Sequence, residues 1–200
     1  MGCTAPPQIY NLNISCQHIK SNSSPPFTAF AHYSITMPHR HCFIEIDNKS
    51  NCYTLANPRV FVESGQCEDP LPPMVAPCSP AITMFNKTTG AATGAVGVFT
   101  YDLFNADLND YNHVLAVMFS VPFDRMLYSN WFAVGIFERG NNCDFSLYNM
   151  MYNGGETTFV RAKATGSSIS YEGDYVIVRA SMSDSAEAIL KVEVSDTGLI

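Results

Sequence analysis

The chain has 200 residues and a mass of 22.0 kDa; 46% of the residues are apolar and 14% are charged, which is enough apolar material for one folded domain. Eleven Lys and Arg against 18 Asp and Glu give a net charge of -7, which argues against nucleic-acid binding and against adhesion driven mainly by anionic lipid. The same composition excludes an intrinsically disordered chain.

Residues 1–38 differ in composition from the rest of the chain. Prolines occupy positions 6, 7, 25 and 26, and a serine-rich stretch covers 21–24. Because proline interrupts both helices and central strands, we expect an irregular N-terminal arm over 1–38 and one folded domain over 39–200. Apolar residues between 9 and 19 fit a short amphipathic helix and a strand equally well. The arm lacks the basic start and continuous apolar run of a secretory leader, so we expect a secreted or soluble protein without a recognisable signal peptide.

From position 42 onward, short runs rich in β-branched and aromatic residues recur between clusters of Gly, Pro, Asn and Asp. This pattern is typical of an all-β sandwich or barrel. Apolar and polar residues alternate over 188–194, so one face of that strand can enter a core. The run 113–121 is apolar nearly throughout, as expected of a central strand covered on both faces. The predicted strands are 42–47, 59–63, 81–85, 95–102, 114–122, 131–138, 157–162, 175–182 and 188–194.

The segment 122–132, PFDRMLYSNWF, is too polar for a buried strand and too apolar for an ordinary loop. Tyrosine and tryptophan favour membrane interfaces, where the ring meets the acyl boundary and the polar group stays hydrated. The same side chains could instead fold inward and close one end of a sandwich. The residues alone leave both readings open.

One segment is predicted to be helical. Asp144 is a good N-cap, Phe145, Tyr148 and Tyr152 recur on one helical face, and Gly154 ends the helix. Tyr148 and Tyr152 lie four residues apart, so both phenol rings can face one ligand. With Tyr128 they could surround a quaternary ammonium, which each ring attracts by about 0.5 to 2 kcal/mol. The alternative is that they pack the helix onto a sheet.

Enzyme and metal signatures are weak. His39, His41 and Cys42 lie close together, but no second cluster completes a metal site. The glycine-rich stretch 90–97 lacks the Lys-Ser/Thr ending of a phosphate loop and leads into an apolar strand. We therefore expect no enzyme, no metal and no cofactor. Seven cysteines without a C-x-x-C pair predict mostly reduced, buried thiols.

Three ungapped blocks make the chain similar to the actinoporins, the sea-anemone cytolysins. They are ATGAVGV at 92–98, LAVMFSVPFD at 115–124 and YSNWF at 128–132. Weaker correspondence extends over 42–194, and VFTYDLF and NWFAVGIF are more similar to the actinoporin-like proteins of fish. The resemblance implies an all-β fold, a two-sheet β-sandwich flanked by one or two short helices. It also implies a phosphocholine pocket selective for sphingomyelin and a homo-oligomer on membranes.

Residue by residue, the resemblance implies a head-group site and a membrane-contacting surface. The phosphocholine-binding residues would be Ser64, Val96, Ser120, Pro122, Tyr128, Tyr148 and Tyr152, and the membrane-contacting residues Met126, Leu127 and Trp131. Leu127 stands where the anemone proteins usually carry a Trp, and Asn153 replaces a third helical Tyr. Both departures reduce the aromatic surface available to a membrane or a choline group.

The arm is the largest departure from the family pattern. Crossing a hydrocarbon core of about 30 Å takes about 20 helical residues. Between the proline pairs only 8–20 could be helical, which is roughly 20 Å.

Two functions are expected: a pore-forming cytolysin that acts on target cell membranes and causes haemolysis and cation leakage, or a non-lytic module that recognises lipid head groups or carbohydrate. The expected partners are membrane lipids, and no nucleic acid.

Overall fold

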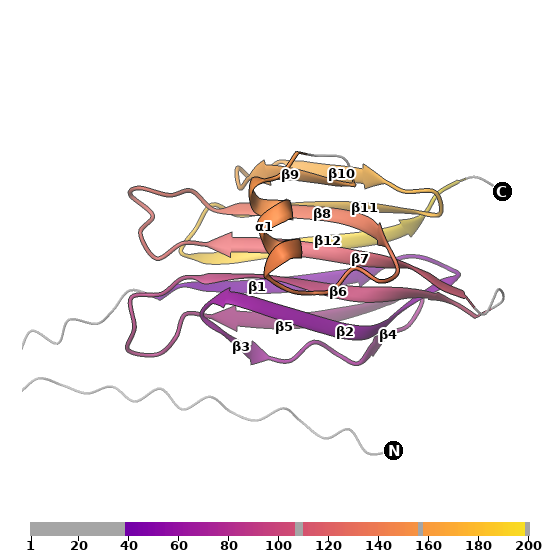
Figure 1. Ribbon diagram of the computed structural model, residues 1–200, viewed down its shortest axis with the longest axis horizontal. Coiled ribbons are helices and arrows are strands. Elements are labelled where there is room, and N and C mark those ends of the chain that lie inside the picture. The colour runs from indigo at the N-terminus through magenta and orange to yellow at the C-terminus, as the bar shows by residue number, and fades with distance from the viewer. Residues whose placement is uncertain (1–38, 107–109, 156–157, 199–200) are drawn as a thin grey trace, which may run out of the picture. The chain divides into compact units, whose positions relative to one another are not determined.

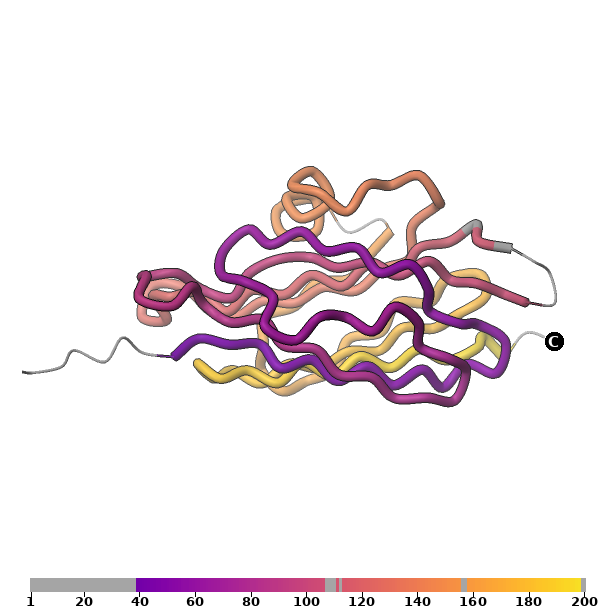
Figure 2. Tube along the Cα trace, turned by 90° about the horizontal axis from the view of Figure 1, so that it is seen from below, coloured from indigo at the N-terminus to yellow at the C-terminus, as the bar shows by residue number. Residues whose placement is uncertain are grey.

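A computed structural model describes residues 39–106, 110–155 and 158–198. The predicted arm over 1–38 lies outside these residues. The described chain folds into two six-stranded sheets packed face to face, with a helix against the outer face of the second sheet (Figure 1, Figure 2). The fold is therefore the predicted two-sheet β-sandwich.

The first sheet has the strand order β10-β11-β12-β1-β5-β3. Its central pair, β1 and β12, is parallel, and its other pairs are antiparallel. Its strands are β1 (His41–Asn48), β3 (Gln66–Asp69), β5 (Ser79–Asn86), β10 (Ser168–Glu172), β11 (Val176–Met182) and β12 (Glu187–Asp196).

The second sheet is antiparallel and has the order β4-β2-β6-β7-β8-β9. Its strands are β2 (Tyr53–Ser64), β4 (Met74–Val75), β6 (Ala95–Asn105), β7 (Asp110–Val121), β8 (Trp131–Glu138) and β9 (Phe159–Lys163). The nine predicted strands are all present, with ends that differ by a few residues.

The core lies between the two sheets and follows the alternation of the strands. In β12, Leu190, Val192 and Val194 are buried, while the residues between them face outward. Phe85 of β5 and Phe119 of β7 meet across the sheets with their ring centroids 4.5 Å apart. Burial of such side chains supplies most of the free energy that holds the two sheets together.

The central strand β7 is covered on both faces, as its apolar sequence predicts. Leu115, Val117 and Phe119 belong to the core between the sheets. Ala116 and Met118, which point the other way, belong to a second buried cluster beneath the helix. The helix therefore explains why this strand lacks a polar face.

The helix α1 (Phe145–Asn153) begins and ends where the sequence predicts. The Asp144 carboxylate accepts hydrogen bonds from the backbone N–H groups of Ser146 and Leu147, at 2.9 and 3.2 Å. The Gly154 N–H donates to the Met150 carbonyl at 2.7 Å and closes the last turn. No helix of the described residues is long and apolar enough to span a membrane.

Three short strands were not predicted. All four residues of β3 are exposed, and β4 has only two residues, so neither carries a hydrophobic pattern. The strand β10 has the sequence SISYE, whose alternation is confined to Ile169 and Tyr171. These strands form because they pair with longer neighbours, which local sequence does not reveal.

The prediction of buried thiols is wrong for three of the five described cysteines. Cys42 is buried and Cys143 partly so, but Cys52, Cys67 and Cys78 are exposed. Cys52 and Cys78 lie at or beside turns, and Cys67 lies on the exposed edge strand β3, so none can reach the core. All five are free thiols, and burial raises the pKa of Cys42 above its ordinary value.

Candidate functional site

A hollow of about 360 Å³ lies at one end of the sandwich, between the end of β2, the loop before β6 and the loop after β7. The two loops extend side by side at the left of Figure 1. The hollow is lined by Ser64, Ala92, Thr93, Gly94, Val96, Pro122, Phe123, Asp124 and Tyr128.

Gly94 allows the two loops to approach each other. A Cβ atom at this position would collide with the Val121 carbonyl oxygen, so only glycine fits without moving the β7 end. The Gly94 N–H also donates to the Ser64 hydroxyl at 3.2 Å. Gly94 therefore lets the loop before β6 form one wall of the hollow.

The loop after β7 is folded around the carboxylate of Asp124. This carboxylate accepts hydrogen bonds from the Met126 and Leu127 N–H groups, at 2.9 and 3.2 Å, and the Tyr128 N–H donates to the Asp124 carbonyl at 3.1 Å. The resulting turn directs apolar side chains into solvent: Met126 is 98% exposed, Leu127 75% and Tyr128 59%. These residues form the apolar tip of the loop.

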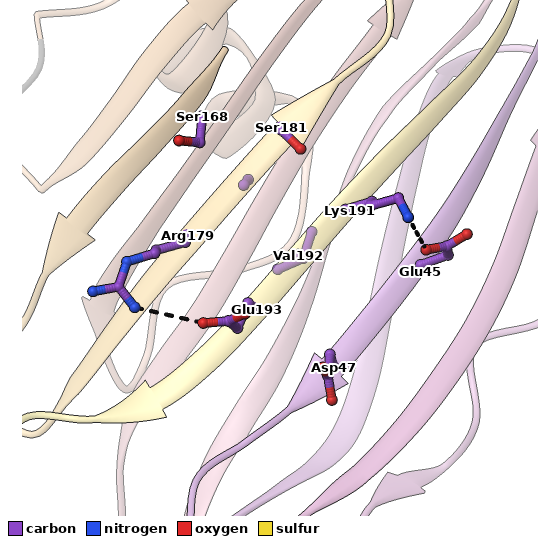
Figure 3. A pocket seen from close by; sticks show the side chains of 9 residues that line it. Glu45, Asp47, Ser168, Arg179, Ser181, Lys191, Val192 and Glu193 are labelled. Carbon is purple, nitrogen blue, oxygen red and sulfur yellow. Dashed lines mark hydrogen bonds and ion pairs between the residues drawn. The ribbon is translucent and has the colours of Figure 1, made fainter. Parts of the chain in front are cut away.

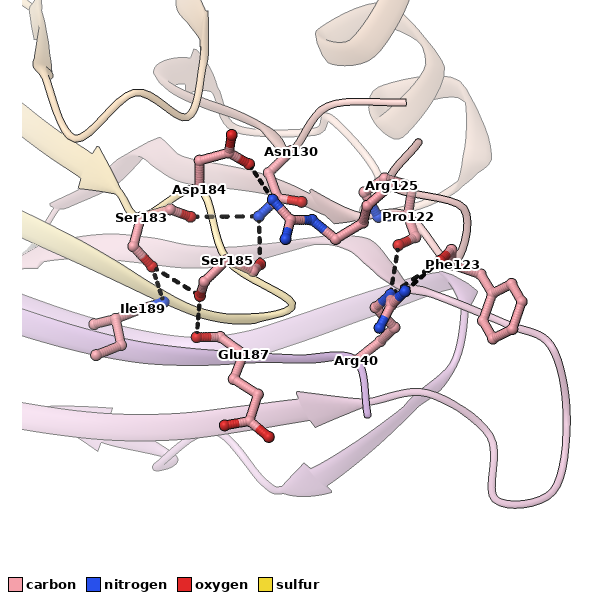
Figure 4. Close-up of polar contacts among 10 residues, drawn as sticks. All are labelled: Arg40, Pro122, Phe123, Arg125, Asn130, Ser183, Asp184, Ser185, Glu187 and Ile189. Carbon is pink, nitrogen blue, oxygen red and sulfur yellow. Dashed lines mark hydrogen bonds and ion pairs between the residues drawn. The ribbon is translucent and has the colours of Figure 1, made fainter. Parts of the chain in front are cut away.

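Arg40 holds one side of this loop from the start of the first sheet. Its guanidinium donates to the carbonyls of Pro122 and Phe123 at 2.7 to 3.1 Å, and its Cζ lies 5.5 Å from the centroid of the Phe123 ring (Figure 4). Several bonds from one planar cation fix the loop more firmly than a single contact would.

The turn between β11 and β12 holds the other side. The amide of buried Asn130 donates to the carbonyls of Ser183 and Ser185, at 3.3 and 2.8 Å, and Arg125 forms an ion pair with Asp184 (Figure 4). The apolar tip is therefore carried by a loop braced on two sides.

Several predicted site residues form a row across the second sheet. Register pairs Ser64 with Val96, Val96 with Ser120, Ser120 with Trp131, and Trp131 with Lys163. Paired residues point to the same face of a sheet, and Val96 places this row on the face that carries α1. Ser120 is only 4% exposed and lies beneath the surface rather than in the hollow.

The helical tyrosines lie apart from the lining of the hollow. Tyr148 and Tyr152 stack on each other with centroids 5.7 Å apart, and Tyr148, only 8% exposed, also packs against Phe61 of β2. Burial raises the pKa of Tyr148 above its ordinary value, so its phenol stays protonated. Four of the seven predicted head-group residues therefore line one hollow: Ser64, Val96, Pro122 and Tyr128. Ser120, Tyr148 and Tyr152 do not.

Trp131 is half-buried on β8, and two cations lie close to its ring. The Arg161 guanidinium carbon is 5.6 Å and the Lys163 ammonium 5.5 Å from a ring centroid of the indole. Arg161 also donates to the carbonyls of Met151 and Tyr152 at the end of α1. Sequence reasoning missed both cations, although two basic residues at i and i+2 after the helix were the available signal.

A second hollow, of about 370 Å³, lies on the outer face of the first sheet (Figure 3). Its charged side chains are paired: Lys191 lies 2.9 Å from Glu45 and Arg179 lies 3.5 Å from Glu193, which also pairs at 2.5 Å with Lys49, a residue outside the lining. None of the predicted site residues lines it. Its paired charges leave little free charge to recognise a ligand.

Glu193 makes this face sensitive to acid. The hydrogen bond from Lys49 lowers the pKa of Glu193, so its stabilising effect is present above about pH 4.3 and is lost as the pH falls through the lowered value. We expect the free energy of unfolding to fall less steeply below about pH 4.3 in Glu193→Gln than in the wild-type protein. The difference should be at most about 1 kcal/mol, because the ion pair is partly exposed. Urea unfolding at several pH values measures this difference, and Glu187→Gln, at an exposed position, is the control. Equal acid sensitivity in both variants would contradict the assignment.

Among the residues that the structure describes, no group of three or more His, Cys, Asp or Glu side chains could hold a metal ion. His39, at the start of the described chain, is exposed, and Cys42 is buried in the core. The arrangement at the hollow instead combines rings, one carboxylate and apolar surface.

The sandwich, its outer helix and the hollow beside an exposed apolar tip define an actinoporin-like protein. The family model described as sea anemone cytotoxic protein matches residues 33–196, so the chain belongs to this family, the actinoporins. The family is one of toxins and is not a known enzyme class.

Two curated toxins and one solved structure illustrate the relationship. DELTA-stichotoxin-Hcr4b of Radianthus crispa is 33% identical over 162 residues, which cover 78% of this chain and 82% of the toxin. DELTA-alicitoxin-Pse1b of Phyllodiscus semoni is 37% identical over 123 residues, 60% of this chain, and the match spans only 51% of that toxin. The crystal structure of the lipid binding protein Nakanori has the same fold, with a TM-score of 0.60 and 15% identity over 78% of this chain and 71% of that one.

Proposed function

We propose that this protein is a secreted cytolysin that recognises choline head groups, with a preference for sphingomyelin, and permeabilises target cell membranes as a homo-oligomer. The observation that carries the proposal is the hollow itself, where Phe123 and Asp124 line the wall together with Tyr128, which also belongs to the apolar tip. A quaternary ammonium is attracted by ring faces and by a carboxylate, and its lipid continues into an apolar layer.

The apolar tip supports contact with the membrane at the same place. Met126 and Leu127 have no cover in the sandwich, and large exposed apolar side chains on a braced loop are typical of interaction surfaces. Because Arg40 and Asn130 fix the loop, little conformational entropy is lost when the tip enters the interface. Head-group binding and shallow insertion would then reinforce each other.

A non-lytic module that binds lipid head groups is the second candidate. The proline pairs of the arm favour it, because they leave too few helical residues to cross a bilayer. Dye release from sphingomyelin vesicles, measured beside co-sedimentation, separates the two functions. Binding with release supports the cytolysin, and binding without release supports the module. No binding to sphingomyelin vesicles would overturn both.

Tyr128 provides the sharpest test of the hollow. We expect Tyr128→Ala to weaken binding to sphingomyelin vesicles about tenfold, since one ring face is lost, with a nearly unchanged melting temperature. Tyr175→Ala is the matched control, because Tyr175 is similarly exposed, at 52% against 59% for Tyr128, but contacts His113 at the opposite end of the sandwich. Equal binding by both variants would place the head group elsewhere.

Tyr152→Ala extends the test to the helix. The family resemblance assigns Tyr152 to the head-group site, and we expect this variant also to bind sphingomyelin vesicles less tightly at an unchanged melting temperature. Tyr152 is half-buried and stacks on Tyr148, outside the lining of the hollow. A lower melting temperature with full binding would instead make it a packing residue of α1.

A further inference from the structure

The basic pair beside Trp131 is a group of charges that the choline hollow does not use. We propose that Arg161, Lys163 and Trp131 form a second lipid site, which binds the phosphate of an anionic head group in a membrane that is otherwise rich in choline lipid. The inference rests on the proposed membrane binding, because it adds a second head-group preference to the same face of the protein.

The register of the second sheet brings the three residues together. Trp131 of β8 is paired with Lys163 of β9, and Arg161 lies two residues before Lys163 on the same face of β9. Both cations lie within 5.6 Å of the indole. The two cations therefore share one face of β9 and contact the same indole, and from these positions we infer that both can reach one phosphate group.

Neither cation has an acidic partner among residues 39–106, 110–155 and 158–198. Five other described cations do form ion pairs, namely Arg59, Arg125, Arg179, Lys49 and Lys191, whereas Arg40 and Lys87 are bound to backbone carbonyls. Arg161 engages one terminal nitrogen with the carbonyls at the end of α1, and no described residue accepts from its Nε or its other terminal nitrogen. Two cations without an acidic partner in the part of the chain that the structure describes are a local attraction for an anion, although the net charge of the chain is -7.

The position of the pair suits a membrane surface. The row from Ser64 to Lys163 crosses five adjacent strands, so at about 4.8 Å per spacing the Ser64 wall of the hollow lies roughly 20 Å from Lys163. This distance is enough for two separate lipids. Lys163 is exposed on β9, and Trp131 is half-buried at the start of β8, the strand that follows the apolar tip. Both side chains can therefore contact the membrane surface when the tip enters it.

The choice of anion follows from the donors. Arginine offers two parallel N–H groups to phosphate oxygens and lysine adds a compact charge, so a terminal phosphate monoester fits better than a carboxylate. The negative body of the protein weakens attraction to a uniformly anionic surface. We therefore expect phosphatidic acid as a minor component of phosphatidylcholine vesicles to be a better target than either a purely neutral or a strongly anionic membrane.

Lys163→Gln tests the site with little risk to folding, because Lys163 is exposed at the end of an edge strand. We expect the wild-type protein to bind phosphatidylcholine vesicles that contain phosphatidic acid at least fivefold more tightly than vesicles without it, and Lys163→Gln to lose about fivefold on the mixed vesicles alone. Lys191→Gln, on the outer face of the first sheet, is the control and should retain wild-type binding. Equal binding of wild-type protein to both vesicles, or equal losses by the two variants, would overturn the proposal.

A soluble probe separates a lipid phosphate from a free one. Trp131 is the sole tryptophan of the chain, so its fluorescence reports directly on this site. We expect glycerol phosphate to change the emission weakly, only at high concentration, and mixed vesicles to change it strongly, with both responses reduced in Lys163→Gln. If inorganic phosphate saturates the change in Trp131 emission and displaces the protein from mixed vesicles at the same concentration, the site binds free phosphate and the lipid assignment is overturned. The soluble titration and the Tyr128→Ala variant distinguish failure of this site from failure of the choline hollow.

Discussion

Leu127→Glu is expected to weaken vesicle binding by about 100-fold or more. Burying a leucine side chain in an apolar layer is worth about 1.5 to 3 kcal/mol, and a carboxylate at the same depth adds a desolvation cost. Leu127 is 75% exposed and lies outside the buried clusters, so the free energy of unfolding should change by less than about 0.5 kcal/mol. Co-sedimentation with sphingomyelin vesicles, together with urea unfolding, measures both quantities.

Met74→Glu is the matched control for this experiment. Met74 is also exposed, but it lies on β4 beside the start of β2, whereas the hollow lies at the end of β2. Full binding by Met74→Glu together with lost binding by Leu127→Glu would place the membrane at the apolar tip. If Leu127→Glu binds as well as the wild-type protein, the tip is not the part that enters the membrane.

Phe119→Ala is expected to have the largest effect on stability. Phe119 is fully buried, packs on Phe85 of the opposite sheet and lies next to Gly97, so truncation leaves a cavity that the sheets cannot close. Such changes cost about 3 to 5 kcal/mol, which corresponds to a drop of roughly 10 °C in the melting temperature for a domain of this size. Calorimetry and urea unfolding measure the loss.

Phe119→Leu should lose much less stability than Phe119→Ala, because the leucine side chain fills most of the space that the ring leaves. Both variants should bind vesicles normally at temperatures where they remain folded, since Phe119 does not line the hollow. A melting temperature unchanged by Phe119→Ala would mean that the contact between Phe85 and Phe119 contributes little to the association of the sheets.

The strands and the helix were predictable because their patterns are local. The alternation around Leu190 and Val192 identifies β12, and Asp144 with Gly154 marks both ends of α1. The edge strands β3 and β4 were not predictable, because their pairing depends on neighbours that come close only in the folded chain. Exposure of Cys67 has the same cause.

Side-chain positions at the candidate site were only partly predictable. The residues of 122–132 fitted both an exposed loop and side chains folded inward, and the structure shows both: Tyr128 is exposed, whereas Phe132 is buried in the core. Sequence spacing could not reveal that Tyr148 turns toward Phe61, because helical periodicity fixes which residues share a face but not what that face meets. The pairing of Trp131 with Lys163 likewise depends on the register of β8 and β9.

The position of β1 determines how the folded domain responds to a pulling force applied at its first described residues. This strand is paired along its whole length with β12 on one edge and β5 on the other, so a pull on its beginning loads two hydrogen-bonded ladders in shear. Such ladders share the load among many hydrogen bonds at once, so β1 resists being separated from the sheet one bond at a time. The folded domain is therefore firmly held at its first strand, and Arg40, which directly precedes that strand, braces the loop beside the hollow.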